Sequence, residues 1–106
     1  MTPEERYEAL VEQVAATGLI WLLEDDAGLV GAVDEEGGRY LAVWPDHEAA
    51  AASAAGPWKR ARPVSMPAAP ALDAAVERDG MVAVHPTADD EGLLVSARDL
   101  AERLSA

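Results

Sequence analysis

Apolar and polar residues alternate at helical spacing at the start of the chain. Thr2 can cap a helix whose first residue is Pro3, and Glu5 completes a capping box with Thr2. Gly18 is the natural end of this helix, because glycine readily adopts the left-handed conformation that follows a last turn. Five apolar residues recur three or four positions apart and predict one buried stripe: Tyr7, Leu10, Val11, Val14 and Ala15.

Three short apolar runs follow Gly18. They comprise Leu19 to Leu23, Leu29 to Val33 and Arg39 to Trp44, and each has the length of a β-strand. The turns between them are rich in Asp, Glu and Gly. Because neighbouring strands joined by tight turns pair most simply side by side, we predict an antiparallel meander.

Helical and extended segments alternate in the second half of the chain. Met81 to Val84 has no polar position and therefore predicts a central strand. The other expected elements are a helix from Asp46 to Ala55, a strand from Arg62 to Met66, a helix carrying Leu72, Ala75 and Val76 that Gly80 ends, a strand from Leu93 to Val95, and a final helix capped by Ser96. This order predicts one α+β domain over residues 1–106, with a mixed, mainly antiparallel sheet of about five to six strands covered by about four helices.

The composition changes the expected core more than the expected fold. Half of the 106 residues are apolar, but 23 of them are alanine, which buries little area. The chain has no Phe. We therefore expect a thin core in which Trp21, Trp44 and Trp58 supply a large share of the burial.

Charge is distributed unevenly along the chain. The net charge is −12, and residues 1–48 hold twelve acids and two bases. Such a charge repels nucleic acid and anionic membranes, so we expect neither as a partner. An acidic first half favours a basic protein partner, although solubility alone explains the same composition.

Reactive constellations are missing from the sequence. Cysteine is absent, which excludes disulfides, thiolate catalysis and Cys-ligated zinc. His47 and His85 lack metal-ligand spacing, and no serine stands in a nucleophile elbow. The acidic turns at residues 24–26, 34–36 and 89–91 lack the calcium-loop pattern. We therefore expect no catalytic residue, no metal and no cofactor, and a protein that is not an enzyme.

Two places remain as binding candidates. The segment from Trp58 to Arg62 combines an aromatic ring with the cations Lys59, Arg60 and Arg62, a composition suited to a small anion or an acidic peptide. A charged loop and edge strand is the structural alternative. His85 precedes Pro86 at the end of an apolar strand, where it either caps the strand or acts as a general base in a pocket.

The order of several short motifs resembles a small family of uncharacterised bacterial proteins known only as a domain of unknown function. The motifs run from Arg6 to Leu104 and include Arg6-Tyr7-Glu8, Val43-Trp44-Pro45, Gly56-Pro57-Trp58, Pro63-Val64-Ser65 and Val84-His85-Pro86. From Ala42 onward the layout is also similar to the N-terminal domain of SseB-like bacterial proteins. His85 departs from the first pattern, which has an aromatic residue there, and alanine replaces bulkier residues around Ala71 to Ala75. The resemblance implies an α+β fold and brings no reaction, cofactor or catalytic residue.

Two functional hypotheses follow. The first is a non-catalytic protein-binding module, such as an inhibitor or immunity-like protein, whose acidic face covers a basic partner. The second is a small-molecule or enzymatic pocket framed by Trp21, Trp44, Trp58 and His85, with Arg60 or Arg62 anchoring an anion. No signal peptide or membrane span is evident, so we expect a cytoplasmic location, and a homo-oligomer remains open.

Overall fold

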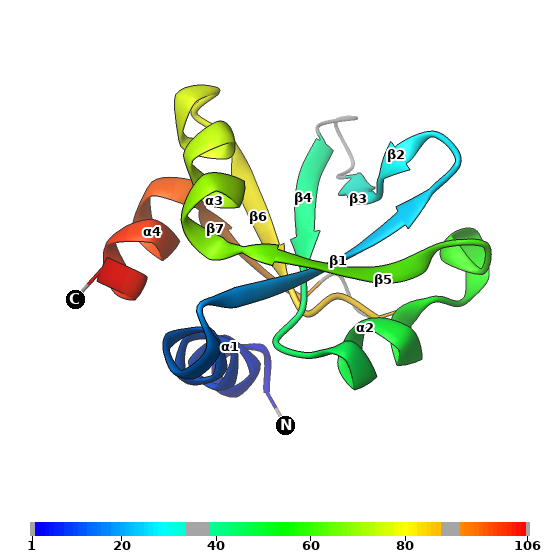
Figure 1. Ribbon diagram of the computed structural model, residues 1–106, viewed down its shortest axis with the longest axis horizontal. Helices are drawn as coiled ribbons and strands as arrows, with labels where there is room; N and C mark the ends of the chain where they lie inside the picture. Colours follow the sequence, from blue (N-terminus) through cyan, green and yellow to red (C-terminus); the bar gives the residue numbers. More distant parts are fainter. Residues whose placement is uncertain (1, 34–38, 88–91, 106) are drawn as a thin grey trace.

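The computed structural model describes residues 2–33, 39–87 and 92–105 (Figure 1). Four α-helices, one short 3₁₀ helix and seven strands lie within these ranges. In chain order they are α1 (Pro3–Thr17), β1 (Leu19–Asp25), β2 (Gly28–Leu29), β3 (Gly31–Val33), β4 (Arg39–Val43), α2 (His47–Ser53), η1 (Gly56–Trp58), β5 (Arg62–Pro67), α3 (Ala68–Glu77), β6 (Met81–Val84), β7 (Leu93–Ser96) and α4 (Ala97–Ser105). The predicted α+β class is confirmed.

The ends of α1 are set by local chemistry. The Thr2 hydroxyl accepts a hydrogen bond from the Glu5 N–H, and the Glu5 carboxylate accepts one from the Thr2 N–H, each at 3.1 Å. Gly18 ends the helix in the left-handed conformation, with φ of 74°. The predicted stripe is correct for Leu10 and Val14, which are buried, but wrong for Ala15, which is exposed. Ala15 lies at the open rim of a hollow that residues of α1, α3 and α4 line, so its side chain stays accessible.

The strands form two sheets that are joined at one point, between β1 and the end of β4. One sheet has the order β2-β1-β5 and the other β3-β4-β6-β7. The two sheets meet where Trp21 of β1 and Trp44 exchange backbone hydrogen bonds of 3.1 and 2.8 Å. All strand pairs are antiparallel except β4 with β6, which is parallel. The mixed, mainly antiparallel character is therefore as predicted, and β6 is central in its sheet.

The predicted strand from Leu29 to Val33 is two strands. Gly28 and Leu29 pair with β1, whereas Gly31 to Val33 pair with β4, so the chain changes sheets at Val30. The Val30 N–H still bonds the Leu23 carbonyl at 2.9 Å. Gly31 permits the crossing, because a Cβ at this position would collide with the Tyr40 carbonyl oxygen. The meander is thus formed, with a bend in its middle strand, and the described strands number seven.

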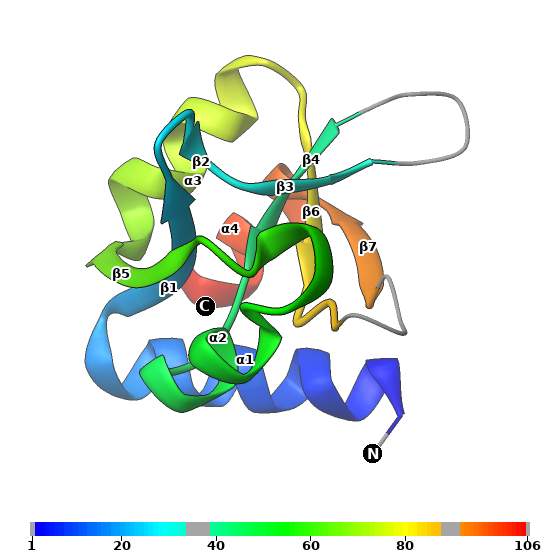
Figure 2. The ribbon, with the colours of Figure 1, turned by 90° about the vertical axis from the view of Figure 1, so that its right-hand side faces the viewer.

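Alternating side chains of β1 and β4 separate two cores. The main core lies between these strands, β6 and the helices α1, α3 and α4. The second core lies on the opposite side, under α2, and its buried members are Leu23, Val30, Ala42, Trp44 and Ala50. Figure 1 shows α3 and α4 on one side of the strands and α2 on the other, and Figure 2 shows α1 running along the base.

The outer edge of β5 carries prolines. Trp21 directs its backbone groups to Trp44, so Ser65, which lies opposite Trp21 on β5, points its own backbone groups away from β1. Pro63 and Pro67 lie two residues to either side and share that outward orientation. Because proline has no N–H, Ser65 supplies the amide donor at these three outward positions.

Two middle helices end earlier than predicted. α2 ends at Ser53, before the predicted Ala55, and the hydroxyl of Ser53 turns back to the Ala49 carbonyl at 3.1 Å. α3, which Gly80 was predicted to end, ends at Glu77, and Asp79 rather than the glycine adopts the left-handed conformation, with φ of 55°. The end of α3 is closed by backbone bonds, from the Asp79 N–H to the Val76 carbonyl at 2.9 Å and from the Gly80 N–H to the Ala75 carbonyl at 2.8 Å.

Candidate functional site

Trp44 belongs to the second core. Its side chain has no exposed area, and its indole N–H is shared between the Ser53 hydroxyl at 3.0 Å and the Pro86 carbonyl at 3.1 Å. These bonds tie β4 to α2 and to the segment after β6. Trp44 therefore presents no surface to a ligand. Its burial and its hydrogen bonds to Ser53 and Pro86 give it a structural role.

The other two tryptophans lie at the edge of the same core. Trp58 of η1 is half-buried and meets Trp44 edge to face at 5.8 Å, and Trp21 meets the exposed His47 ring edge to face at 5.3 Å. Such geometry is the favoured one for aromatic pairs in a core. Among the surface hollows are four lined by described residues, and neither a tryptophan nor His85 lines any of these four.

The basic segment faces acids. Lys59 and Arg60 are exposed and line a hollow of ≈ 430 Å³ together with Asp25 and Asp26 of the β1–β2 turn. Arg62 forms an ion pair with Glu24 at 3.7 Å. An anion entering this hollow would meet both signs of charge. The structure therefore places the predicted cations against the first acidic turn, whereas the acidic turns at residues 34–36 and 89–91 lie outside the described residues.

His85 occupies a strained corner where β6 ends. Its φ is 50°, a conformation uncommon for residues other than glycine. Its N–H bonds the Val43 carbonyl at 2.8 Å, and its carbonyl accepts a hydrogen bond from the Arg6 guanidinium at 3.1 Å. Burial lowers the pKa of the half-buried ring, Arg6 lowers it further, and Asp46 opposes both. The residue thus joins α1, β4 and β6 through its backbone.

The stability of the protein should depend on pH through His85. Its native pKa lies below the ordinary value of 6.5, so the unfolded state binds more protons at this position than the native state does. The free energy of unfolding should therefore fall as the pH drops through about 6.5, and level off below the native pKa. Urea unfolding at a series of pH values tests this. His85→Asn, which tolerates the positive φ, should reduce the pH dependence, and an unchanged dependence would contradict the assignment.

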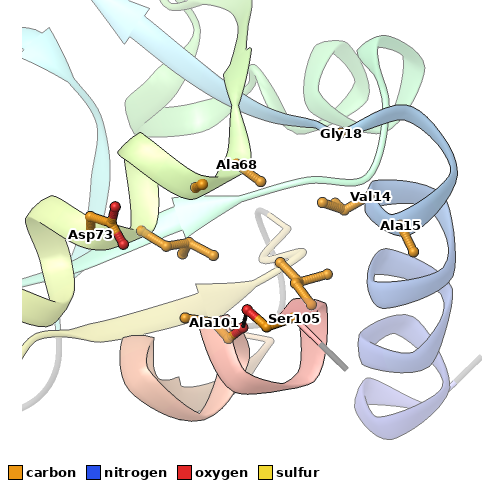
Figure 3. A pocket seen from close by; sticks show the side chains of 10 residues that line it. Val14, Ala15, Gly18, Ala68, Asp73, Ala101 and Ser105 are labelled. Atoms are coloured by element: carbon orange, nitrogen blue, oxygen red, sulfur yellow. Dashed lines mark hydrogen bonds between the residues drawn. The ribbon is translucent and has the colours of Figure 1, made fainter.

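An apolar hollow lies where three helices meet. Figure 3 shows Val14 of α1, Ala68 of α3 and Ala101 of α4 around it. Its volume is ≈ 300 Å³. Val14, Ala68 and Leu72 form a buried floor, and Asp73 is the charged member of its lining. We call this the three-helix hollow.

A further groove opens between the end of α3 and the strands. It has a volume of ≈ 430 Å³ and includes Leu29, which is 45% exposed, Leu41, Met81 and the exposed Arg78. Its lining is more polar than that of the three-helix hollow. Sequence reasoning missed both depressions. Abundant alanine was the one sequence feature that could have indicated the three-helix hollow. It could not locate the hollow, because the lining residues come from three separate helices.

Four carboxylates share one side of α1. Glu4, Glu8 and Glu12 follow one another at four-residue spacing, and Glu5 lies beside them, so all four project from one exposed face. We call this the acidic face of α1. Glu8 forms a two-pronged hydrogen-bonded ion pair with Arg103 of α4, at 2.9 and 3.2 Å. This contact lowers the pKa of Glu8.

Metal ligands do not converge in the described ranges. No three His, Asp or Glu side chains there lie together closely enough to hold a metal ion. No helix in the described part of the chain is long and apolar enough to cross a membrane.

The fold and these surfaces define a small α+β domain with two cores, an acidic helix face and an apolar hollow beside it. The chain belongs to the family described as "Protein of unknown function (DUF2750)", which matches residues 7–104. No curated protein and no solved structure matches the chain. The family match confirms the resemblance to a domain of unknown function. The similarity of the second half to SseB-like N-terminal domains stays a prediction.

Proposed function

We propose that the protein is a non-catalytic module that binds a basic protein partner. The acidic face of α1 carries this proposal. Of its four carboxylates, Glu8 is paired with a cation and Glu5 is held in the capping box, while Glu4 and Glu12 are exposed with no ion pair to a described residue. These groups project a negative field that attracts a basic surface and speeds association.

The placement of the two histidines and of Trp44 supports a binding role over a catalytic one. His85 has its backbone groups committed to Val43 and Arg6, and His47 lies at the start of α2 against Trp21. Trp44, which would have lined an enzymatic pocket, is sealed inside the second core. Buried aromatic side chains of this kind stabilise the domain and leave recognition to its surface.

Removing the charge of the acidic face should weaken partner binding by about tenfold at low salt. The test variant combines Glu4→Gln with Glu12→Gln. Its matched control combines Glu77→Gln with Asp79→Asn, which removes the same charge from exposed positions near the end of α3. Immobilised protein is exposed to host extract across a salt series, and the affinity of any captured partner is then measured with purified components.

The expected partner is basic, is released as salt rises, and distinguishes the two variants. Salt should reduce its affinity for the wild type and the control more steeply than for the Glu4/Glu12 variant, because exposed charges are screened. Capture of no salt-sensitive protein, or equal losses in the two variants, would refute the proposed function.

A further inference from the structure

We infer that the three-helix hollow seats an apolar anchor side chain of the basic partner, with cationic residues of the same segment on the carboxylates around it. This inference rests on the proposed function and adds a second, hydrophobic part to its interface. Surfaces that bind through charge alone associate fast but hold weakly, whereas a buried apolar anchor supplies much of the affinity of an interface.

The hollow exists because small side chains meet there. Gly18, Ala68, Ala69 and Ala101 line it, and no large side chain extends from these positions to fill the space. Its floor is apolar, so water inside finds few hydrogen-bond partners. An apolar group that displaces this water gains the free energy of burial.

The size of the hollow favours a side chain over a whole ligand. Its volume of ≈ 300 Å³ lies at the lower end of the range for sites that enclose small molecules. The hollow is suited to one Leu, Met or Phe side chain that enters from the solvent side. Leu104, half-buried on α4, would become covered by such a group.

The acidic face leads directly into the hollow. Ala15, which lines it, follows Glu12 by three residues and so lies on the same side of α1, one turn further along. Asp73 of α3 provides a carboxylate at another part of the rim (Figure 3). An occupant therefore meets negative charge from two helices around an apolar centre, which matches an apolar residue flanked by Lys or Arg.

A neighbouring hollow extends the surface along α3 and α4. It has a volume of ≈ 330 Å³ and shares Asp73, Ala101 and Ser105 with the three-helix hollow, adding Val76. Two adjoining depressions suit an amphipathic helix, whose anchors recur three or four residues apart. Asp73 and Glu102 line the second depression with Arg98, so acids also outnumber bases there.

The probe for the test is a synthetic, amidated helical peptide with Leu at i, i+3 and i+7 and Lys at the remaining positions. A second peptide carries Ala in place of each Leu. The protein variant is Ala15→Leu, which fills the hollow from its exposed rim. Ala16→Leu is the matched control, because Ala16 is the next exposed residue of α1 and does not line the hollow.

Ala15→Leu should weaken binding of the Leu–Lys peptide by about tenfold, and Ala16→Leu by less than about twofold. The Ala–Lys peptide should bind more weakly and respond equally to both variants. Ala69→Leu, which fills the hollow from α3, should reproduce the loss if Ala15→Leu proves unstable in urea unfolding. The inference would be overturned if the wild type and the variants with a filled hollow bound the Leu–Lys peptide equally well. It would also be overturned if the wild type bound neither peptide.

The outcomes separate this inference from the proposed function. If Glu4→Gln with Glu12→Gln weakens the native partner while Ala15→Leu does not, the acidic face acts alone and the anchor is absent. If Ala15→Leu abolishes a concentration-dependent dimer of the protein itself, a second copy occupies the hollow and the inference fails. If both variants weaken the native partner, charge and anchor act in one interface.

Discussion

Replacing Trp44 with alanine should lower the free energy of unfolding by about 3–5 kcal/mol. The side chain has no exposed area and makes the largest single contribution to the second core. Its loss would leave a cavity between β4 and α2. It would also remove the N–H donor that the Ser53 hydroxyl and the Pro86 carbonyl share. Because domains of this size are stable by roughly 5–15 kcal/mol, the variant should be near the limit of folding.

Urea unfolding of graded variants measures this effect. Trp44→Phe keeps an aromatic ring but no N–H, and should lose about 1–3 kcal/mol because a buried carbonyl is left without its donor. Trp58→Ala is the matched control, since it deletes the same side chain where it is half-buried. Equal losses for Trp44→Ala and Trp58→Ala would show that the hydrogen bonds and full burial of Trp44 contribute nothing extra.

Gly92→Ala should destabilise the protein by about 2–5 kcal/mol. Gly92 has a φ of 75°, and a Cβ there would collide with the Val84 carbonyl oxygen and lie 3.2 Å from the Pro86 nitrogen. Both neighbours are backbone atoms at the end of β6, so they cannot move aside as a flexible side chain would.

Gly18→Ala is the control for Gly92→Ala. Gly18 has a φ of 74°, but a Cβ there would meet no atom within 4 Å. Its substitution therefore carries only the conformational cost, about 1–2 kcal/mol. The difference between the two midpoints of urea unfolding isolates the steric term. A loss as small at Gly92 as at Gly18 would mean that the β6–β7 connection shifts to accommodate the methyl group.

Local signals in the sequence predicted the elements well. The capping box of Thr2, the left-handed Gly18 and the Ser96 cap of α4 are all present, the last through a 3.0 Å bond from the Asp99 N–H. Each depends on residues within a few positions of one another. The uninterrupted apolar run of β6 correctly indicated burial on both faces.

Tertiary features were beyond the same signals. The split at Val30 depends on two sheets meeting, and nothing in the alternation of residues 29–33 separates a straight strand from one that changes partners. The parallel pairing of β4 with β6 depends on how α2, β5 and α3 return the chain. The sequence predicted large tryptophan burial, which Trp44 satisfies completely, yet this burial also removes Trp44 from any ligand-facing surface.

The sequence indicated the negative charge of the candidate site but not the hollow beside it. An excess of acids in residues 1–48 indicated a basic partner, and the helical spacing of Glu4, Glu8 and Glu12 gathers part of that charge on one face. Alanines from three helices line much of the three-helix hollow. Its location could not be predicted, because the contributing alanines are far apart in the chain and meet only after folding.

The prolines on β5 affect what happens when concentrated chains touch. Fibril growth and strand-swapped aggregation extend a sheet by adding amide donors along an exposed edge. At the outward positions of β5, Pro63 and Pro67 offer no donor, and Ser65 alone does. An incoming strand would gain one amide bond from these three positions and meet two pyrrolidine rings. This edge therefore protects the protein against templated polymerisation, even though β1 beside it is one of the most apolar strands in the chain.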